Sequence, residues 1–162
     1  MKNLFLLVLL AVCSHSLFSQ VGQPPYKQQK FLPDFELLQA DNSKFSSGKL
    51  KKGAPTIIMF FSPGCDHCIK QFEDMVKRQN DLKNHQIVMA TIQPIEEIQE
   101  FVKKYKISSY PNYTVGKDEK FFLPPFFQIQ NFPYLAFYDK NGKLISTFEG
   151  NLTVDEILTR YK

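Results

Sequence analysis

One stretch in the first half of the sequence constrains the fold most. Thr56–Phe61 is a continuous run of apolar, β-branched and aromatic residues, which is typical of a central strand covered on both faces. A Ser-Pro-Gly turn follows, and Cys65 and Cys68 then open an amphipathic helix that we expect to end near Asn84. The sequence therefore places two cysteines at a strand-to-helix junction.

The remaining patterns alternate between strand and helix and indicate one α/β domain. In chain order we expect a hairpin from Phe31–Leu38 and Phe45–Leu50, the strand Thr56–Phe61, the helix Asp66–Asn84, the strand Gln86–Ile92, the helix Ile95–Tyr105, a hairpin from Tyr134–Tyr138 and Lys143–Phe148, and a terminal helix. Thr153 and Glu156 form a capping box at the start of that helix. Residues 107–131 are less regular, and the proline-broken segment Phe121–Phe127 predicts a loop or a short helix.

The N-terminus looks like a secretory signal. Lys2 precedes an apolar run from Leu4 to Val12, which is too short to span a bilayer as a helix. Small residues follow, and we expect cleavage after Ser19, which removes residues 1–19 and leaves no membrane span. Lipid attachment at Cys13 is the alternative. The chain is thus expected outside the cytoplasm.

The mature chain divides into a flexible lead-in and one domain. The polar segment Gln20–Lys30 contains two adjacent prolines, and the domain spans residues 31–162. The full chain has 162 residues and a net charge of +4, but Arg78 and Arg160 are its only arginines. It therefore lacks the clustered basic stripe that nucleic acids require, and we expect a monomer without a nucleic-acid partner.

Removal of the signal would leave Cys65 and Cys68 as the only cysteines of a secreted chain. A helix N-terminus stabilises an anion, so Cys65 is the predicted nucleophile, and Cys68, one turn later, is the predicted resolving residue that attacks a mixed disulfide. His67, when protonated, would add positive charge beside the Cys65 thiolate, and Asp66 would oppose it. We expect these two residues to tune the redox properties of the pair.

The chain resembles the thioredoxin superfamily, and in particular secreted thioredoxin-like proteins of the alkyl hydroperoxide reductase and thiol-specific antioxidant type. The matching segments are Leu32–Phe35, Phe60–Cys68, Phe132–Leu135 and Asp139–Lys143. The resemblance implies a thioredoxin fold, with a central mixed β-sheet covered by helices, an N-terminal β-hairpin and an insertion before a cis-proline. It also implies a periplasmic thiol-disulfide oxidoreductase.

In that family the proline that corresponds to Pro133 is cis and faces the cysteine pair, and the backbone before it, here Phe132, can pair with an extended substrate. Two positions depart from the pattern. Gly64 stands where the family often has tryptophan, and Met59 stands where thioredoxin has a buried aspartate. Another carboxylate or solvent would then have to accept the Cys68 proton.

These features predict an enzyme that exchanges disulfides with protein thiols through Cys65 and Cys68 and is served by a redox partner. A structural disulfide and half of a metal site are the alternatives for the pair. No cofactor or metal is expected, because His67 and His85 are the only histidines of the mature chain, and Ile69 excludes a Cys-x-x-Cys-His haem motif. The alternative functions are a thiol-dependent peroxidase and a non-catalytic binding module that docks a partner on the phenylalanine-rich insertion.

Overall fold

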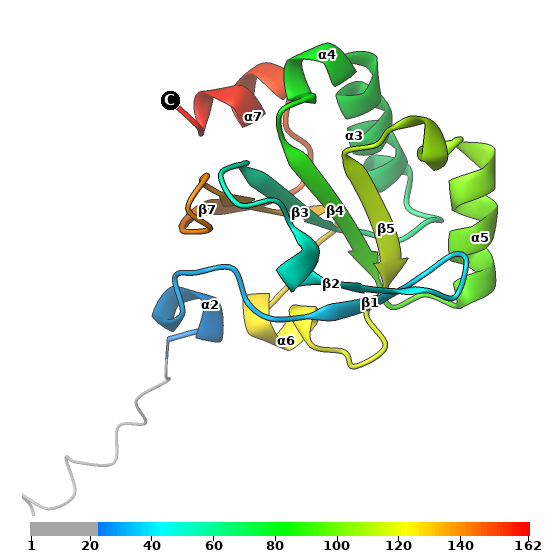
Figure 1. The fold of residues 1–162 in the computed structure, drawn as a ribbon, viewed down its shortest axis with the longest axis horizontal. Helices are drawn as coiled ribbons and strands as arrows, with labels where there is room; N and C mark the ends of the chain where they lie inside the picture. The colour runs from blue at the N-terminus through cyan, green and yellow to red at the C-terminus, as the bar shows by residue number, and fades with distance from the viewer. Residues whose placement is uncertain (1–22) are drawn as a thin grey trace, which may run out of the picture.

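The computed structural model describes residues 23–162 of the chain. The predicted signal peptide (residues 1–19), its cleavage after Ser19 and the alternative lipid attachment at Cys13 lie outside the described residues. None of the helices in residues 23–162 has the length and apolar character needed to cross a membrane. Strands and helices alternate through most of this part (Figure 1).

A mixed sheet forms the centre of the fold, and within residues 23–162 it has seven strands in the order β2-β1-β5-β4-β3-β6-β7. The strands are β1 (Glu36–Gln39), β2 (Lys44–Ser46), β3 (Thr56–Phe60), β4 (Gln86–Thr91), β5 (Tyr113–Lys117), β6 (Tyr134–Tyr138) and β7 (Leu144–Glu149). β3, β4 and β5 are parallel, whereas β6 is antiparallel to β3. Every residue of β3 is buried, as the apolar run predicts for a central strand.

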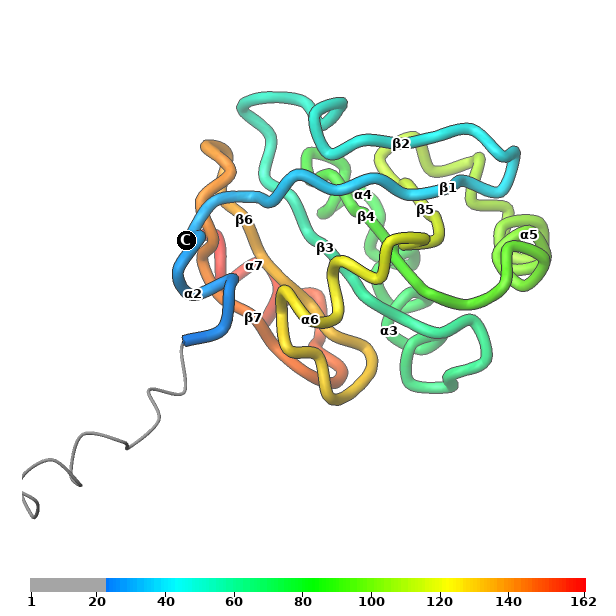
Figure 2. The backbone as a smooth tube through the Cα atoms, turned by 90° about the horizontal axis from the view of Figure 1, so that it is seen from below, coloured from blue at the N-terminus to red at the C-terminus, as the bar shows by residue number. Residues whose placement is uncertain are grey.

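Helices cover both faces of the sheet (Figures 1 and 2). They are α2 (Pro25–Gln28), α3 (Asp66–Lys77), α4 (Gln79–Leu82), α5 (Ile95–Lys104), α6 (Leu123–Phe127) and α7 (Val154–Thr159), with short 3-10 turns η2 (Ser47–Lys49) and η3 (Ile107–Ser109). Residues of α3, α5 and α7 share a core with Ile57 and Met59 of β3. Residues of α6 share a second core with Ile58 and Phe60, whose side chains point to the opposite face of the sheet. We call the first the cysteine face and the second the α6 face.

Both predicted hairpins and the predicted helix cap are present, although the first hairpin is shorter than predicted. Its first strand begins at Glu36 rather than Phe31, and η2 follows its second strand at Ser47–Lys49. β1 pairs with β2, and β6 pairs with β7, each antiparallel. The hairpin of β1 and β2 joins the edge of the main sheet through β5. At the start of α7, the Glu156 carboxylate accepts a hydrogen bond from the Thr153 backbone N–H at 2.8 Å, and the Thr153 hydroxyl accepts one from the Glu156 N–H at 3.3 Å.

The segment 107–131, for which a less regular structure was expected, contains the strand β5. The sequence did not predict β5 because this strand is short and includes Gly116, and glycine weakens a strand pattern. A side chain at Gly116 would come within 2.8 Å of Leu37 Cβ and 2.9 Å of the Leu38 carbonyl oxygen, so the glycine allows β1 to approach β5 closely. The proline-broken segment Phe121–Phe127 contains the short helix α6.

Two further boundaries differ from expectation. The predicted helix Asp66–Asn84 is divided at Arg78, whose backbone leaves the helical region (φ −106°, ψ 28°). The described part of the predicted flexible lead-in contains α2, because the Tyr26 ring packs against Phe127 of α6 at a centroid distance of 5.8 Å.

Candidate active site

The two cysteines follow the end of β3, at the edge of the sheet where the parallel strands β3, β4 and β5 end. We call this the cysteine edge of the sheet. The Phe61 N–H donates to the Ala90 carbonyl at 3.0 Å and so keeps the chain beside β4. The Cys65 N–H then donates to the Ser62 carbonyl at 3.1 Å, which closes the turn, and α3 begins at Asp66. The predicted strand-turn-helix arrangement is therefore confirmed.

Cys65 is the N-cap residue of α3. Its backbone is extended (φ −93°, ψ 114°), and its Sγ accepts a hydrogen bond from the Cys68 N–H at 3.4 Å. The side chain is half-buried, so it remains in contact with solvent. Backbone N–H groups at a helix start favour an anion at this place, and the position therefore suits a thiolate nucleophile.

Cys68 lies one turn inside the helix in a different environment. It is 1% exposed and belongs to the core of the cysteine face. Burial, reinforced by its hydrogen bond with Cys65, raises the pKa of the Cys68 thiol to about 12. The groups in residues 23–162 that alter this pKa include no carboxylate, and the position that holds a buried aspartate in thioredoxin holds the fully buried Met59.

Asp66 and His67 lie between the cysteines in sequence and are both exposed. Neither side chain makes a hydrogen bond or ion pair with another residue of the described part of the chain. The His67 carbonyl accepts a hydrogen bond from Asn151 Nδ2 at 2.7 Å. Solvent therefore surrounds both ionisable groups, and water weakens any electrostatic effect that they have on the cysteines.

Pro133 reaches the same edge of the sheet from β6. Phe60 pairs with Tyr134 in the antiparallel β3–β6 ladder, so the residue before β6 lies beside the residues that follow β3. The Phe132–Pro133 peptide bond is cis, which confirms the geometry that the family resemblance implied. Pro133 is buried, whereas Phe132 is 39% exposed and packs its ring 5.7 Å from that of Phe60.

A glutamine that the sequence analysis did not single out joins α3 to the loop after β7. Gln71 is fully buried; its Nε2 donates to the Leu152 carbonyl at 3.1 Å, and its Oε1 accepts from the Leu152 N–H at 2.7 Å. In the same loop the Gly150 N–H donates to the Pro133 carbonyl at 2.8 Å. The loop thus connects the cysteine helix with the proline segment. The signal in the sequence was a polar residue within the apolar stripe of α3.

His85 does not join this site. It follows α4, immediately before β4, at the opposite edge of the sheet from the end of β3. Its ring is buried and contacts the Tyr161 ring at a centroid distance of 4.7 Å. Residues 23–162 contain no group of three or more histidine, cysteine, aspartate or glutamate side chains that could hold a metal ion.

Comparisons with known proteins agree with this architecture. Residues 29–156 match the model of the AhpC/TSA family. A protein of Neisseria meningitidis assigned as a thioredoxin shares 28% identity over 79% of this chain and 87% of its own, with a TM-score of 0.63. The exposed lipoprotein thioredoxin Etrx1 of Streptococcus pneumoniae shares 25% identity over 78% of this chain and 96% of its own, with a TM-score of 0.61.

A protein of Chlorobium tepidum assigned as the thiol:disulfide interchange protein DsbE has a TM-score of 0.65 and 21% identity over 81% of this chain and 92% of its own, a likeness that concerns the fold. A comparison with curated proteins found no match. The predicted thioredoxin fold and the predicted superfamily are confirmed. The family match spans most of the chain, and the chain therefore belongs to the AhpC/TSA family, as a thioredoxin-like thiol-disulfide oxidoreductase.

Proposed function

We propose that this chain is an extracytoplasmic thiol-disulfide oxidoreductase that exchanges disulfides with protein thiols through Cys65 and Cys68. The observation that carries the proposal is the contrast between the two sulfurs. Cys65 is half-buried at the N-terminus of α3, whereas Cys68 is buried one turn inside it. A client can thus reach Cys65, while Cys68 can reach only a sulfur already bound at Cys65.

When the pair reduces a client, the Cys65 thiolate attacks one sulfur of the client disulfide. A Cys65–client disulfide forms, and the other client sulfur leaves as a thiolate. Cys68 then loses its proton and attacks Cys65 Sγ, which forms the Cys65–Cys68 disulfide and releases the second client thiolate. Two electrons pass from the pair to the client, and the reverse sequence oxidises a client dithiol. The reduction potential of the pair relative to its redox partner sets the direction.

The proton of Cys68 leaves to solvent in this scheme. Its pKa is raised to about 12 by burial, and the groups in the described part of the chain that act on this pKa include no carboxylate. Resolution of the mixed disulfide should therefore accelerate with rising pH, because hydroxide or a solvent base has to remove the proton.

A trapping experiment tests the two roles. Cys68→Ser should accumulate mixed disulfides through Cys65, whereas Cys65→Ser should accumulate few, and non-reducing gels of both variants with a disulfide-bonded protein would show the difference. Equal trapping by the two variants would contradict the assignment. Oxidation of a thiol substrate that depends on added peroxide would instead identify a peroxidase.

The residues between the cysteines are proposed to tune the pair. His67→Ala removes the positive charge that a protonated imidazole would supply, which should destabilise the Cys65 thiolate, and with it the reduced form, so the pair becomes less oxidising. Asp66→Asn should shift the reduction potential in the opposite direction. Equilibration with glutathione buffers measures both reduction potentials.

Pro133 and the backbone of Phe132 are proposed to face the substrate, since they lie at the edge of the sheet where the cysteines follow β3.

The extracytoplasmic location rests on the signal-like N-terminus and on the neighbours, one of which is described as an exposed lipoprotein. We propose a periplasmic monomer, with lipid attachment at Cys13 as the alternative. The intact mass of protein isolated from its native compartment distinguishes the two. A chain that begins near Gln20 is expected, and a chain that retains Met1 would contradict secretion.

A further inference from the structure

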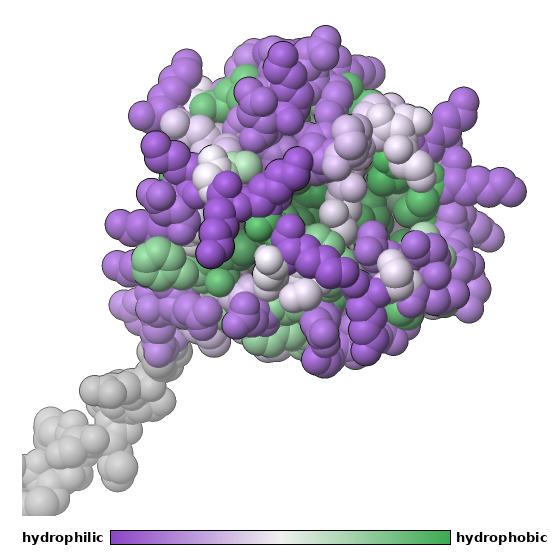
Figure 3. Space-filling model, in the orientation of Figure 1, coloured by the Kyte–Doolittle hydropathy of each residue, from purple (hydrophilic) through white to green (hydrophobic). Residues whose placement is uncertain are grey.

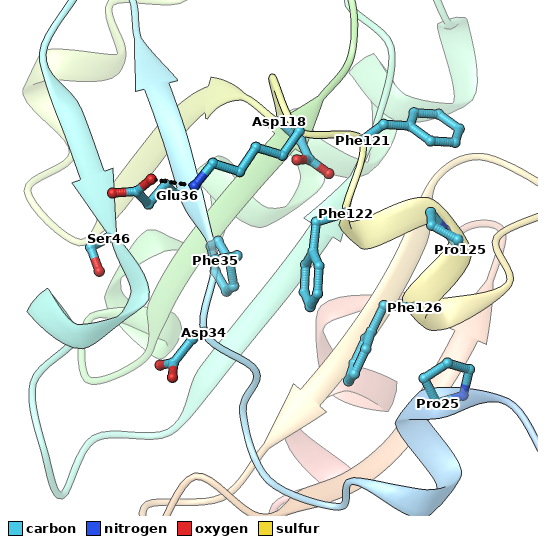
Figure 4. A pocket seen from close by; sticks show the side chains of 11 residues that line it. Pro25, Asp34, Phe35, Glu36, Ser46, Asp118, Phe121, Phe122, Pro125 and Phe126 are labelled. Carbon is cyan, nitrogen blue, oxygen red and sulfur yellow. Dashed lines mark hydrogen bonds and ion pairs between the residues drawn. The ribbon is translucent and has the colours of Figure 1, made fainter.

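A pocket of about 760 Å³ opens on the α6 face of the sheet (Figure 4). Its walls come from the start of α2, the segment that leads into β1, the end of β2, the loop after β5, and α6. The cysteines belong to the core of the other face. The volume lies within the roughly 300–1,000 Å³ that is typical of ligand pockets. The proposed redox chemistry does not use this space.

Aromatic rings form the apolar wall of the pocket. Phe35, Phe122 and Phe126 lie along it in Figure 4, and Pro125 and Pro25 continue the wall toward α2. Apolar residues also reach the surface over α6, at the lower edge of the molecule in Figure 3. Such a wall suits an aromatic or branched aliphatic side chain, because large rings offer much apolar contact area.

The same pocket gathers negative charge, in a chain whose net charge is +4. Among the residues that the structure describes, three carboxylates line it, from Asp34, Glu36 and Asp118, against the single ammonium group of Lys120. Lys120 Nζ lies 2.7 Å from Glu36 Oε2 and so neutralises that carboxylate. Asp34 is exposed and forms no ion pair within residues 23–162. The charged residues that line the pocket therefore favour the binding of a positively charged group.

Asp118 supplies an independent sign of a missing partner. It is 2% exposed, and its Oδ2 accepts a hydrogen bond from the Leu123 N–H at 2.7 Å. Its Oδ1 is buried and has no hydrogen-bond donor within residues 23–162. Buried polar atoms are nearly always paired, because leaving one unpaired destabilises the folded protein. An ammonium or guanidinium group in the pocket would compensate this carboxylate electrostatically.

The pocket wall is also continuous with the segment that precedes Pro133. The Phe126 ring packs against Phe127 at 4.9 Å, and Phe127 packs against Tyr134, the first residue of β6, at 5.3 Å. Residues 128–132 lead from α6 to Pro133. A polypeptide that occupies the pocket would therefore lie on the same insertion that reaches the cysteine edge of the sheet.

We propose that this pocket binds a segment of the client protein in which an apolar side chain adjoins a lysine or arginine. The apolar side chain lies against Phe35, Phe122 and Phe126, and the cation lies beside Asp34 and within the field of Asp118. The inference rests on the proposed function only in that the segment belongs to a redox client. Binding itself does not require the cysteines.

Fluorescence anisotropy tests the inference with a cysteine-free, fluorescein-labelled peptide of Leu, Phe and Lys, and with a matched peptide in which Glu replaces every Lys. The lysine peptide should bind and the glutamate peptide should not. Asp34→Asn should weaken binding about two- to fivefold, as expected for loss of an exposed ion pair, and Phe121→Ser at the rim should weaken it similarly. Glu100→Gln and Phe31→Ser, at exposed positions that do not line the pocket, are the matched controls.

Equal affinity for both peptides, or unchanged affinity in Asp34→Asn, would overturn the inference. So would phenethylamine binding as tightly as the lysine peptide, because the occupant would then be a small amine. The double variant Cys65→Ser/Cys68→Ser separates this result from the proposed function. It should bind the peptide as the unmodified protein does while exchanging no disulfides, whereas a wild-type protein that binds the peptide but exchanges no disulfides would contradict only the redox proposal.

Discussion

The two faces of the sheet are covered in different ways. Helices α3, α5 and α7 pack on the cysteine face, and the core there includes many side chains with no exposed area. The α6 face is covered by the five-residue helix α6 together with the four-residue helix α2, and beside them the acidic aromatic pocket opens. The proposed redox pair thus lies where packing fixes its geometry, whereas the proposed binding surface lies where the covering layer is thin.

The aromatic clusters of the two faces differ in the same sense. Phe72 on the cysteine face is surrounded by the rings of Phe101, Tyr105 and Tyr113, at centroid distances of 5.4, 5.3 and 5.9 Å. Phe126 on the α6 face contacts two rings and borders the pocket with another part of its surface. Truncation of a side chain that is packed on all sides destabilises the folded protein more than truncation of one that borders an open pocket.

The largest effect should come from Phe72→Ala. We expect it to lower the free energy of unfolding by about 3–5 kcal/mol, because the lost ring leaves a cavity on the closed face. Phe126→Ala, on the open face, should cost clearly less. Urea denaturation of both variants measures the difference, and equal losses would show that the two faces are packed alike.

A smaller loss is expected from Gln71→Leu. This substitution leaves the buried N–H and carbonyl of Leu152 without partners, which should cost about 2–3 kcal/mol in unfolding free energy. Asn151→Ala removes an exposed hydrogen bond from the same loop to α3 and should cost about 1 kcal/mol. The two variants compared by urea denaturation test whether the buried contact holds the loop, and a loss for Gln71→Leu no greater than that for Asn151→Ala would contradict it.

The strand that precedes the cysteines could be predicted from the sequence because its cause is local. The apolar run Thr56–Phe61 and the helical stripe after Cys65 each follow from periodicity within one element, and the Thr153 capping box follows from a spacing of three residues. Family resemblance added the cis bond at Pro133, which no local pattern specifies.

The remaining features depend on residues far apart in the chain. β5 becomes a strand because β4 and β1 flank it. The need for a glycine at position 116 is apparent only once Leu37 is known to lie against it. Gln71 pairs with Leu152, 81 residues away. The pocket joins the segment before β1 to the loop after β5. Sequence patterns describe neighbours along the chain and not such distant contacts, so these features could be identified only from the fold.

The burial of Cys68 should appear as a loss of stability in alkali. Its pKa is raised from an ordinary value of 9.0 to about 12, so above pH 9 the unfolded chain loses this proton while the folded chain keeps it. The stabilisation is complete below pH 9 and should fall by at most about 1.4 kcal/mol per pH unit above it. Burial also raises the pKa of Tyr113, Tyr134, Tyr138 and Tyr161, whose contributions begin above pH 10.

Urea denaturation of the reduced protein between pH 8.5 and 10 isolates the cysteine. Cys68→Ala should flatten the decline, and the matched variant Cys65→Ala should retain it. A decline that is unchanged in Cys68→Ala would show that the thiol is accessible to solvent in the folded protein, and it would remove the contrast between the two sulfurs.

The smallest effect concerns His85, at the edge of the sheet opposite the cysteines. Burial lowers the pKa of this imidazole below its ordinary 6.5, and its Nδ1 has no hydrogen-bond partner in the part of the chain that the structure describes. As the pH falls below 6.5, the unfolded chain binds a proton that the folded chain resists, so stability should decline by about 1 kcal/mol or less between pH 6.5 and 5.5. His85→Phe keeps an aromatic contact with Tyr161 and should abolish the decline, whereas His67→Asn should leave it unchanged. Thermal unfolding at both pH values distinguishes them, since a decline that persists in His85→Phe must arise from another group.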